Sequence, residues 1–254
     1  MFANETIKGL TFIDLISQKY DVVATNPPYM YTRTMGQSLK DFLEIYYLDS
    51  KYDLYSAFIR RNMDFISFNS YIAMITQHSF MFLAFYEKLR CAILDNFWIR
   101  TMAHLGPHAF EDIGGEKVNT TMFSISSRDP NRASLFIKLI DLESPQEKGE
   151  YIKNIANLYD SPRVLSHYQT DFEKIPSSPI IYSISDNIRD SFSKYDPLDD
   201  ESENSKATPK CGLATCNNDM FLRFWWEIND EMVGIKWFPY MKGGKYNKWY
   251  GNND

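Results

Sequence analysis

The sequence predicts an α/β fold whose sheet has an antiparallel strand at its edge. Apolar runs of strand length alternate with longer segments in which apolar residues recur at helical spacing. Two strand-like runs then close the pattern, which is typical of an α/β sheet with an antiparallel edge. Of the 254 residues, 44% are hydrophobic, so the chain can bury a substantial core.

The first predicted strand is Tyr20 to Thr25, whose apolar centre is typical of a buried parallel strand. It must end at Asn26, because Pro27 and Pro28 cannot donate hydrogen bonds to a neighbouring strand. The two prolines also keep the preceding backbone extended. Ligands of open α/β sheets bind at the carboxyl ends of the strands, so this segment is expected to border a cleft.

The other elements are predicted from the spacing of apolar residues. Strands are expected over 70–76 and 98–105, followed by a strand pair at 118–126 and 133–140. Helices are expected over 39–48, 53–68 and 80–96. In the last of these, the charged residues Glu87, Lys88 and Arg90 are expected to face water.

The four residues Asn26, Pro27, Pro28 and Tyr29 carry a chemical prediction. The amino group of adenine is a poor nucleophile until acceptors hold its hydrogens and favour a more tetrahedral nitrogen. The side-chain oxygen of Asn26 and the carbonyl of Pro27 are suitable acceptors, and neither needs to be a strong base. Tyr29 offers a face for stacking of a base that has been extruded from the duplex. An ordinary Pro-Pro turn after a strand is the competing interpretation.

Charge and cysteine content exclude several classes of protein. A net charge of −6 argues against a generally basic nucleic-acid coat, so any DNA contact must be local. Three cysteines without a signal peptide favour a reduced, cytoplasmic protein. Cys211 and Cys216 lack a second Cys or His pair at zinc spacing, so no metal site is expected. No apolar run is long enough to span a membrane.

Longer segments after the motif carry a family resemblance. The segments NPPY, SYIAMITQHSF and HLGPHAFEDIGGEKVNTTMFSI resemble, in this order, the second half of an N6-adenine-specific DNA methyltransferase. The tail segments 212–227 and 236–254 resemble the PglX-type enzymes of BREX phage-defence systems more narrowly. The resemblance to the catalytic half covers roughly residues 15–140.

The resemblance implies a domain organisation. The fold is expected to be the C-terminal half of a Rossmann-like methyltransferase sheet, followed by the start of a target-recognition region. Residues 1–145 would form this half of the catalytic domain, 146–210 a connecting helical and polar segment with an acidic linker, and 211–254 the beginning of target recognition.

The resemblance also implies a site and its partners. The catalytic motif falls on Asn26, Pro27, Pro28 and Tyr29, with Tyr29 and Phe110 stacking on the base. S-adenosylmethionine is the implied cofactor, and double-stranded DNA is the implied partner, with other phage-defence proteins or a complementary N-terminal fragment as further candidates. Arg33, Lys242 and Lys245 are candidate DNA contacts, because basic residues among aromatics suit a nucleic-acid backbone and its bases.

The family binds its cofactor through a Gly-rich turn and an acidic residue that both precede the NPPY motif. Neither occurs before Asn26 in this sequence. The chain is therefore expected to be an incomplete piece of the enzyme, one that neither binds S-adenosylmethionine well nor methylates DNA in isolation. Turnover of tritiated cofactor by the purified chain would contradict this expectation.

Two other functions stay open. The same motif serves enzymes that methylate the side-chain amide of glutamine in proteins, although these end soon after the closing strands, whereas this chain continues from Ile140 to Asp254. The third possibility is a noncatalytic DNA-binding subunit that keeps the fold.

Overall fold

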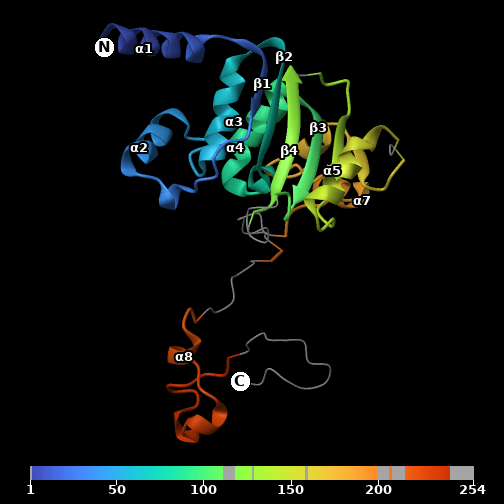
Figure 1. The fold of residues 1–254 in the computed structure, drawn as a ribbon. Coiled ribbons are helices and arrows are strands. Elements are labelled where there is room, and N and C mark those ends of the chain that lie inside the picture. Colours follow the sequence, from blue (N-terminus) through green and yellow to red (C-terminus); the bar gives the residue numbers. More distant parts are fainter. Residues whose placement is uncertain are drawn as a thin grey trace. The chain divides into compact units, whose positions relative to one another are not determined.

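The computed structural model describes residues 2–110, 118–127, 129–157, 160–198, 206–207 and 215–240. The chain divides into two compact units, Met1–Pro197 and Leu198–Asp254. The first unit contains the sheet and the candidate site (Figure 1).

The first unit is built on a mixed six-stranded sheet. Its order is β1-β2-β4-β3-β5-β6, and β1, β2, β3 and β5 run in one direction while β4 and β6 run in the other. The carboxyl ends of the four parallel strands therefore lie on the same side of the sheet, where these strands end. The strands are β1 (Tyr20–Thr25), β2 (Ile66–Gln77), β3 (Phe97–Gly106), β4 (Thr120–Ser127), β5 (Ser134–Lys138) and β6 (Val164–His167).

The helices of the described residues are mostly short. Longer segments between strands form α-helices, and single turns of 3₁₀-helix fill several connections. The α-helices are α1 (Phe2–Ser17), α2 (Gln37–Tyr46), α3 (Leu54–Phe65), α4 (Glu87–Asn96), α5 (Pro145–Lys153), α6 (Thr170–Glu173), α7 (Asp186–Lys194) and α8 (Asn218–Phe221). The 3₁₀ turns are Thr32–Thr34, His78–Met81, Ala84–Tyr86, Ile155–Asn157, Trp225–Glu227 and Asp230–Met232.

The expected pairing of the two closing strands is wrong. β4 and β5 do not pair with each other, because both pair with β3, one on each side. β4 is antiparallel but central, since it fills the space between β2 and β3. Phe123 and Ile125 of this central strand are buried in the main core. The antiparallel strand at the edge is β6, which the sequence pattern did not predict.

The first strand is also less buried than expected. β1 pairs in parallel with β2, but it forms the opposite edge of the sheet, and the side chain of Val22 is 61% exposed. An apolar strand at an exposed edge has unpaired backbone groups available to a further strand.

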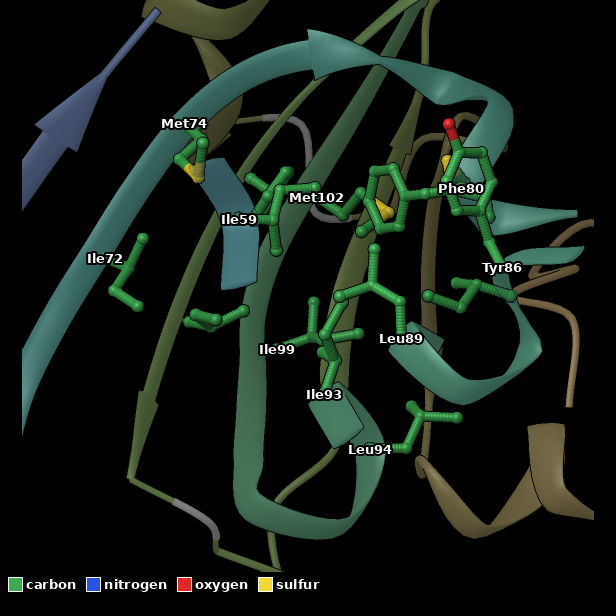
Figure 2. Packing of buried hydrophobic residues seen from close by; sticks show 14 of the residues in the cluster. Ile59, Ile72, Met74, Phe80, Tyr86, Leu89, Ile93, Leu94, Ile99 and Met102 are labelled. Carbon is green, nitrogen blue, oxygen red and sulfur yellow. The ribbon is translucent and has the colours of Figure 1, made fainter. Parts of the chain in front are cut away.

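The main core lies between one face of the sheet and helices α3 and α4 (Figures 1 and 2). Figure 2 shows Ile59 of α3 and Ile93 of α4 directed toward Ile99 of β3. A second cluster on the other face joins β3 and β5 to α5 through residues such as Leu105 and Tyr151. Apolar clusters therefore lie on both faces of β3 and β5.

Arg90 does not face water as expected. It is fully buried on α4, where its Nη1 donates to the carbonyls of Phe80 and Leu83 at 3.0 and 2.6 Å. Its Nε and Nη2 donate to the carbonyl of Ser177 at 3.1 and 2.7 Å. Four hydrogen bonds compensate for the loss of water around the guanidinium, so Arg90 ties α4 to a distant loop.

The second unit has few buried side chains among its described residues. Phe224 and Trp226 stack with ring centroids 4.5 Å apart and planes within 3° of parallel. Trp225 and Trp226 remain more than half exposed, as do Ile235 and Phe238. In the described ranges of the whole chain, no helix has the length and apolar character needed to cross a membrane.

Candidate functional site

The motif Asn26–Tyr29 lies directly after β1, at the carboxyl edge of the parallel strands. Asn26 and Pro28 are exposed, whereas Pro27 is buried. Asn62 of α3 is buried and donates from Nδ2 to Oγ1 of Thr25 at 3.1 Å. This hydrogen bond joins the side chain of the last strand residue to α3, and Asn26, the next residue along the chain, is exposed.

Tyr29 is anchored rather than free. Its ring is half-buried and packs edge-on against Tyr55 at a centroid distance of 6.1 Å, and its hydroxyl donates to the carbonyl of Ile75 at 3.4 Å. Burial, together with the nearby carboxylate of Asp53, raises the pKa of Tyr29 to about 12. The hydroxyl therefore stays protonated at neutral pH, and the ring keeps a fixed orientation.

Asp53 is an important residue of the site that the sequence reasoning missed. Its side chain is 3% exposed, and its Oδ1 accepts from the backbone N–H groups of Met30 at 2.9 Å and Tyr55 at 3.3 Å. One carboxylate thus caps the start of α3 and holds the residue that follows the motif. Burial raises its pKa despite these bonds. An Asp before an amphipathic helix is a cap signal, but nothing in the sequence indicated the contact with Met30.

Further backbone bonds secure the segment after the motif. Leu54 N–H donates to the carbonyl of Met30 at 3.0 Å, and Thr32 N–H donates to that of Tyr52 at 2.9 Å. Tyr31 and Asp53 form an isolated antiparallel bridge. The segment that leaves the site is therefore pinned to the chain just before α3.

The remaining sequence-derived candidates are dispersed. Arg33 is exposed, two residues after Tyr31, and its guanidinium lies 6.0 Å from the Tyr31 ring centroid. Phe110 is half-buried in the loop after β3, and no ring contact joins it to Tyr29 within the described residues. Phe110 therefore stays a prediction. Lys242 and Lys245 lie outside the described residues.

Gly106 sets the direction in which the chain leaves β3 toward Phe110. Its φ is +68°, a conformation that side chains disfavour, and a Cβ would lie 2.9 Å from the Cα of Ile140. The backbones approach here because Leu139 N–H donates to the carbonyl of His104 at 2.9 Å. Glycine is therefore required at this exit.

Three polar side chains, of which His78 is half-buried and His104 and Tyr182 are buried, form a hydrogen-bonded chain at the same end of the strands. His78 Nδ1 and His104 Nε2 are 2.7 Å apart, and His104 Nδ1 lies 2.9 Å from the hydroxyl of Tyr182. Burial lowers the pKa of His104 to about 4, with smaller contributions from His78 and Lys138. Burial also lowers the pKa of His78. Both rings are therefore neutral at pH 7, and they link the turn after β2, strand β3 and the segment around Tyr182.

This arrangement predicts acid sensitivity. The folded pKa of His104 lies below the unfolded value of about 6.5, so its contribution to stability is complete above that value and decreases as the pH falls toward 4. Between pH 7 and pH 5 we expect a loss of about 2 kcal/mol in the free energy of unfolding. Urea unfolding at both pH values measures it. His104→Gln should lose much less over the same interval, and an equal loss in both proteins would contradict the assignment.

The described residues do not fit S-adenosylmethionine by themselves. The segment before β1 is helix α1, which contains Gly9 but no turn in which glycines follow a strand. No group of three or more His, Cys, Asp or Glu side chains in the described part of the chain could hold a metal ion.

Comparison with protein families and curated proteins identifies relatives. The family described as Eco57I restriction-modification methylase matches residues 3–110. The adenine-specific methyltransferase PglX of Lacticaseibacillus casei (strain Zhang) is 35% identical over 251 residues, which is 93% of this chain and 20% of that protein. The adenine-specific methyltransferase BrxX of Escherichia coli O9:H4 (strain HS) is 36% identical over 248 residues, 94% of this chain and 20% of the relative. The chain thus spans about one fifth of the length of these relatives.

Solved structures share the fold at low sequence identity. A structure from a study of the assembly and conformational transition of the type I restriction-modification system has a TM-score of 0.50 at 17% identity, and the match covers 69% of this chain and 39% of that one. The DrdV–DNA complex has a TM-score of 0.50 at 15% identity, covering 68% of this chain and 19% of that one. These matches support the mixed α/β architecture of the first unit.

Proposed function

We propose that this chain forms the target-base part of a DNA adenine methyltransferase. The premise is its similarity, along nearly its whole length, to the adenine-specific methyltransferases PglX and BrxX. The enzyme would transfer a methyl group from S-adenosylmethionine to N6 of adenine, in phage defence or restriction-modification. The single observation that carries the proposal is the exposed Asn26, which directly follows β1 at the carboxyl end of the strands, next to a Thr25 that is hydrogen-bonded to Asn62.

The proposed role of Asn26 and Pro27 is to orient the amine. The Asn26 side-chain oxygen and the Pro27 carbonyl would accept the two N–H groups, which directs the nitrogen lone pair out of the plane of the base. This is catalysis by positioning and electrostatics, and it requires acceptors that do not move. The bond from Asn62 to Thr25 on one side and that from Met30 to Asp53 on the other support such rigidity.

The proposed role of Tyr29 is to stack on the extruded base. Extrusion costs a few kcal/mol of unstacking, which contacts in the pocket must offset. Because Tyr29 is already held by Tyr55 and the carbonyl of Ile75, little side-chain entropy would be lost when a base binds. Phe110 is a second candidate for the same role.

The cofactor site would be completed by polypeptide that docks against β1. Support comes from the exposed Val22 on an unpaired strand edge and from the apolar residues of α1 that face water. We therefore expect the purified chain alone to bind S-adenosylmethionine poorly and to be inactive. The exposed apolar residues of α1 are Ile7, Leu10, Phe12, Ile13, Leu15 and Ile16.

The proposed function is tested by mapping N6-methyladenine in the DNA of the host strain, with and without the gene. We expect a specific sequence context to lose its methylation on deletion and to regain it when the gene is restored. Unchanged methylation would contradict the enzymatic proposal. If the chain nevertheless binds DNA, that result would favour a noncatalytic DNA-binding subunit. The similarity to two adenine-specific methyltransferases favours adenine over protein glutamine as the substrate.

A further inference from the structure

A groove lies immediately beyond the motif, between the segment that follows it and helix α2. Its volume is about 360 Å³. We call it the basic groove. It is lined by Tyr31, Thr32, Arg33, Gln37, Lys40, Glu44, Lys51 and Tyr52.

Positive charge predominates in the basic groove. Three cationic side chains, Arg33, Lys40 and Lys51, face one carboxylate, Glu44, which pairs with Lys51 at 3.2 Å. Neither Arg33 nor Lys40 forms an ion pair within the described residues. Because the whole chain carries a net charge of −6, this cluster is a local reversal of sign and not part of a basic coat.

Two of the cations are positioned by tyrosine rings. The guanidinium of Arg33 lies 6.0 Å from the ring centroid of Tyr31, and the ammonium of Lys51 lies 5.9 Å from that of Tyr52. Cation–π contacts at such distances restrict a long side chain without neutralising its charge. The cations can therefore still bind an anion.

The floor of the basic groove is held by the bonds that hold the motif. Thr32 Oγ1 lies 3.0 Å from the carbonyl oxygen of Lys51 and 2.7 Å from that of Tyr52, and its single proton is shared between them. Tyr31 forms a bridge with Asp53. Tyr31 is two residues from Tyr29, so their Cα atoms are at most roughly 7 Å apart. An anion in the groove would therefore lie within about two nucleotides of a base stacked on Tyr29.

We infer that the basic groove binds a backbone phosphate of the DNA strand beside the target adenine, with Arg33 and Lys40 as its principal donors. The inference rests on the proposed function, since it assigns the substrate contact next to the same motif. A contact of this kind fixes the register of the strand without reading its sequence. The phosphate oxygens accept charge-assisted hydrogen bonds from the guanidinium and the ammonium.

The test measures the salt dependence of DNA binding by fluorescence anisotropy, using the whole chain and a labelled duplex. Each phosphate contact contributes about 0.9 to the slope of log K against log salt. We expect Arg33→Gln and Lys40→Gln each to reduce the slope by up to about 0.9 and to weaken binding several-fold at low salt. Lys88→Gln, at an exposed position of α4, is the matched control and should leave the slope unchanged.

Other outcomes would overturn the inference. An unchanged slope in both groove variants would do so, as would the absence of DNA binding by the unaltered chain at low salt. In a third such outcome, Arg33→Gln and Lys40→Gln weaken the binding of inorganic phosphate but leave the salt slope of DNA binding constant. The groove would then be a site for free anions.

The failure of this inference differs from failure of the proposed function. Asn26→Ala should leave the salt slope unchanged, because Asn26 is assigned to the base and not to the backbone. If methylation in the host depends on the gene but the groove variants leave the salt slope unchanged, the phosphate-binding role of the groove is contradicted and the proposed enzyme function stands. If the groove variants change the salt slope but no methylation depends on the gene, the phosphate-binding role of the groove stands and the proposed enzyme function is contradicted.

Discussion

Replacing Asn26 with alanine in the host gene is expected to abolish the N6-methyladenine that depends on that gene. The substitution removes one of the two proposed acceptors for the amine, and the loss of a single preorganised polar group at a reacting centre typically lowers turnover by about 10²–10³-fold. Sequencing that reports methylated adenines measures the result. DNA binding should be retained, because the basic groove and its cations are unaffected.

Two variants make this result specific. Asn26→Asp keeps an acceptor oxygen on a side chain of the same length, so we expect partial methylation. Asn131→Ala removes the same amide from an exposed turn before β5 and should leave methylation at the wild-type level. Methylation by Asn26→Ala at the level of the unaltered gene would refute the role assigned to this residue. Loss of methylation together with loss of folded protein would support a purely structural role.

Asp53→Ala should have the largest effect on stability among substitutions near the site. It removes the cap of α3 and leaves the part-buried N–H of Met30 without its acceptor. The lost cap and the unpaired N–H together are expected to cost about 2–3 kcal/mol of the free energy of unfolding. Urea unfolding followed by circular dichroism measures this difference. The base site should weaken as well, because Met30 follows Tyr29.

Asp53→Asn is the matched control. It keeps Oδ1 as an acceptor and removes the charge that burial penalises, so its stability at pH 7 should equal or exceed that of the original chain. The direction of this change in stability follows from the pKa of Asp53, which burial raises in the folded state. The carboxyl therefore favours folding most below its unfolded pKa of 3.8, and this contribution is lost as the pH rises through the folded value. An Asp53→Ala chain that unfolds at the same urea concentration as the unaltered chain would contradict the assignment.

Much of the secondary structure could be predicted from the sequence because it depends on local patterns. The five predicted strands correspond to β1–β5, and the predicted helices overlap α2, α3 and α4. The position of β4 could not be predicted, because strand order depends on which neighbours bury Phe123 and Ile125. The burial of Arg90 could not be predicted for a similar reason, since two of its hydrogen bonds go to the carbonyl of Ser177, which is distant in the sequence.

For the candidate site too, some features follow from the local sequence and others only from the tertiary structure. Two prolines after an apolar strand forbid its continuation wherever the strand lies, so the sequence by itself determined that β1 stops before the prolines. The motif and its resemblance predicted the chemistry. Only the tertiary structure decided what holds that motif: Asn62 on Thr25, Asp53 on Met30, and a basic groove beside Tyr31. These contacts join residues separated by about 20 to 40 positions, and such pairings are selected by packing and hydrogen-bond satisfaction in three dimensions, which no local pattern encodes.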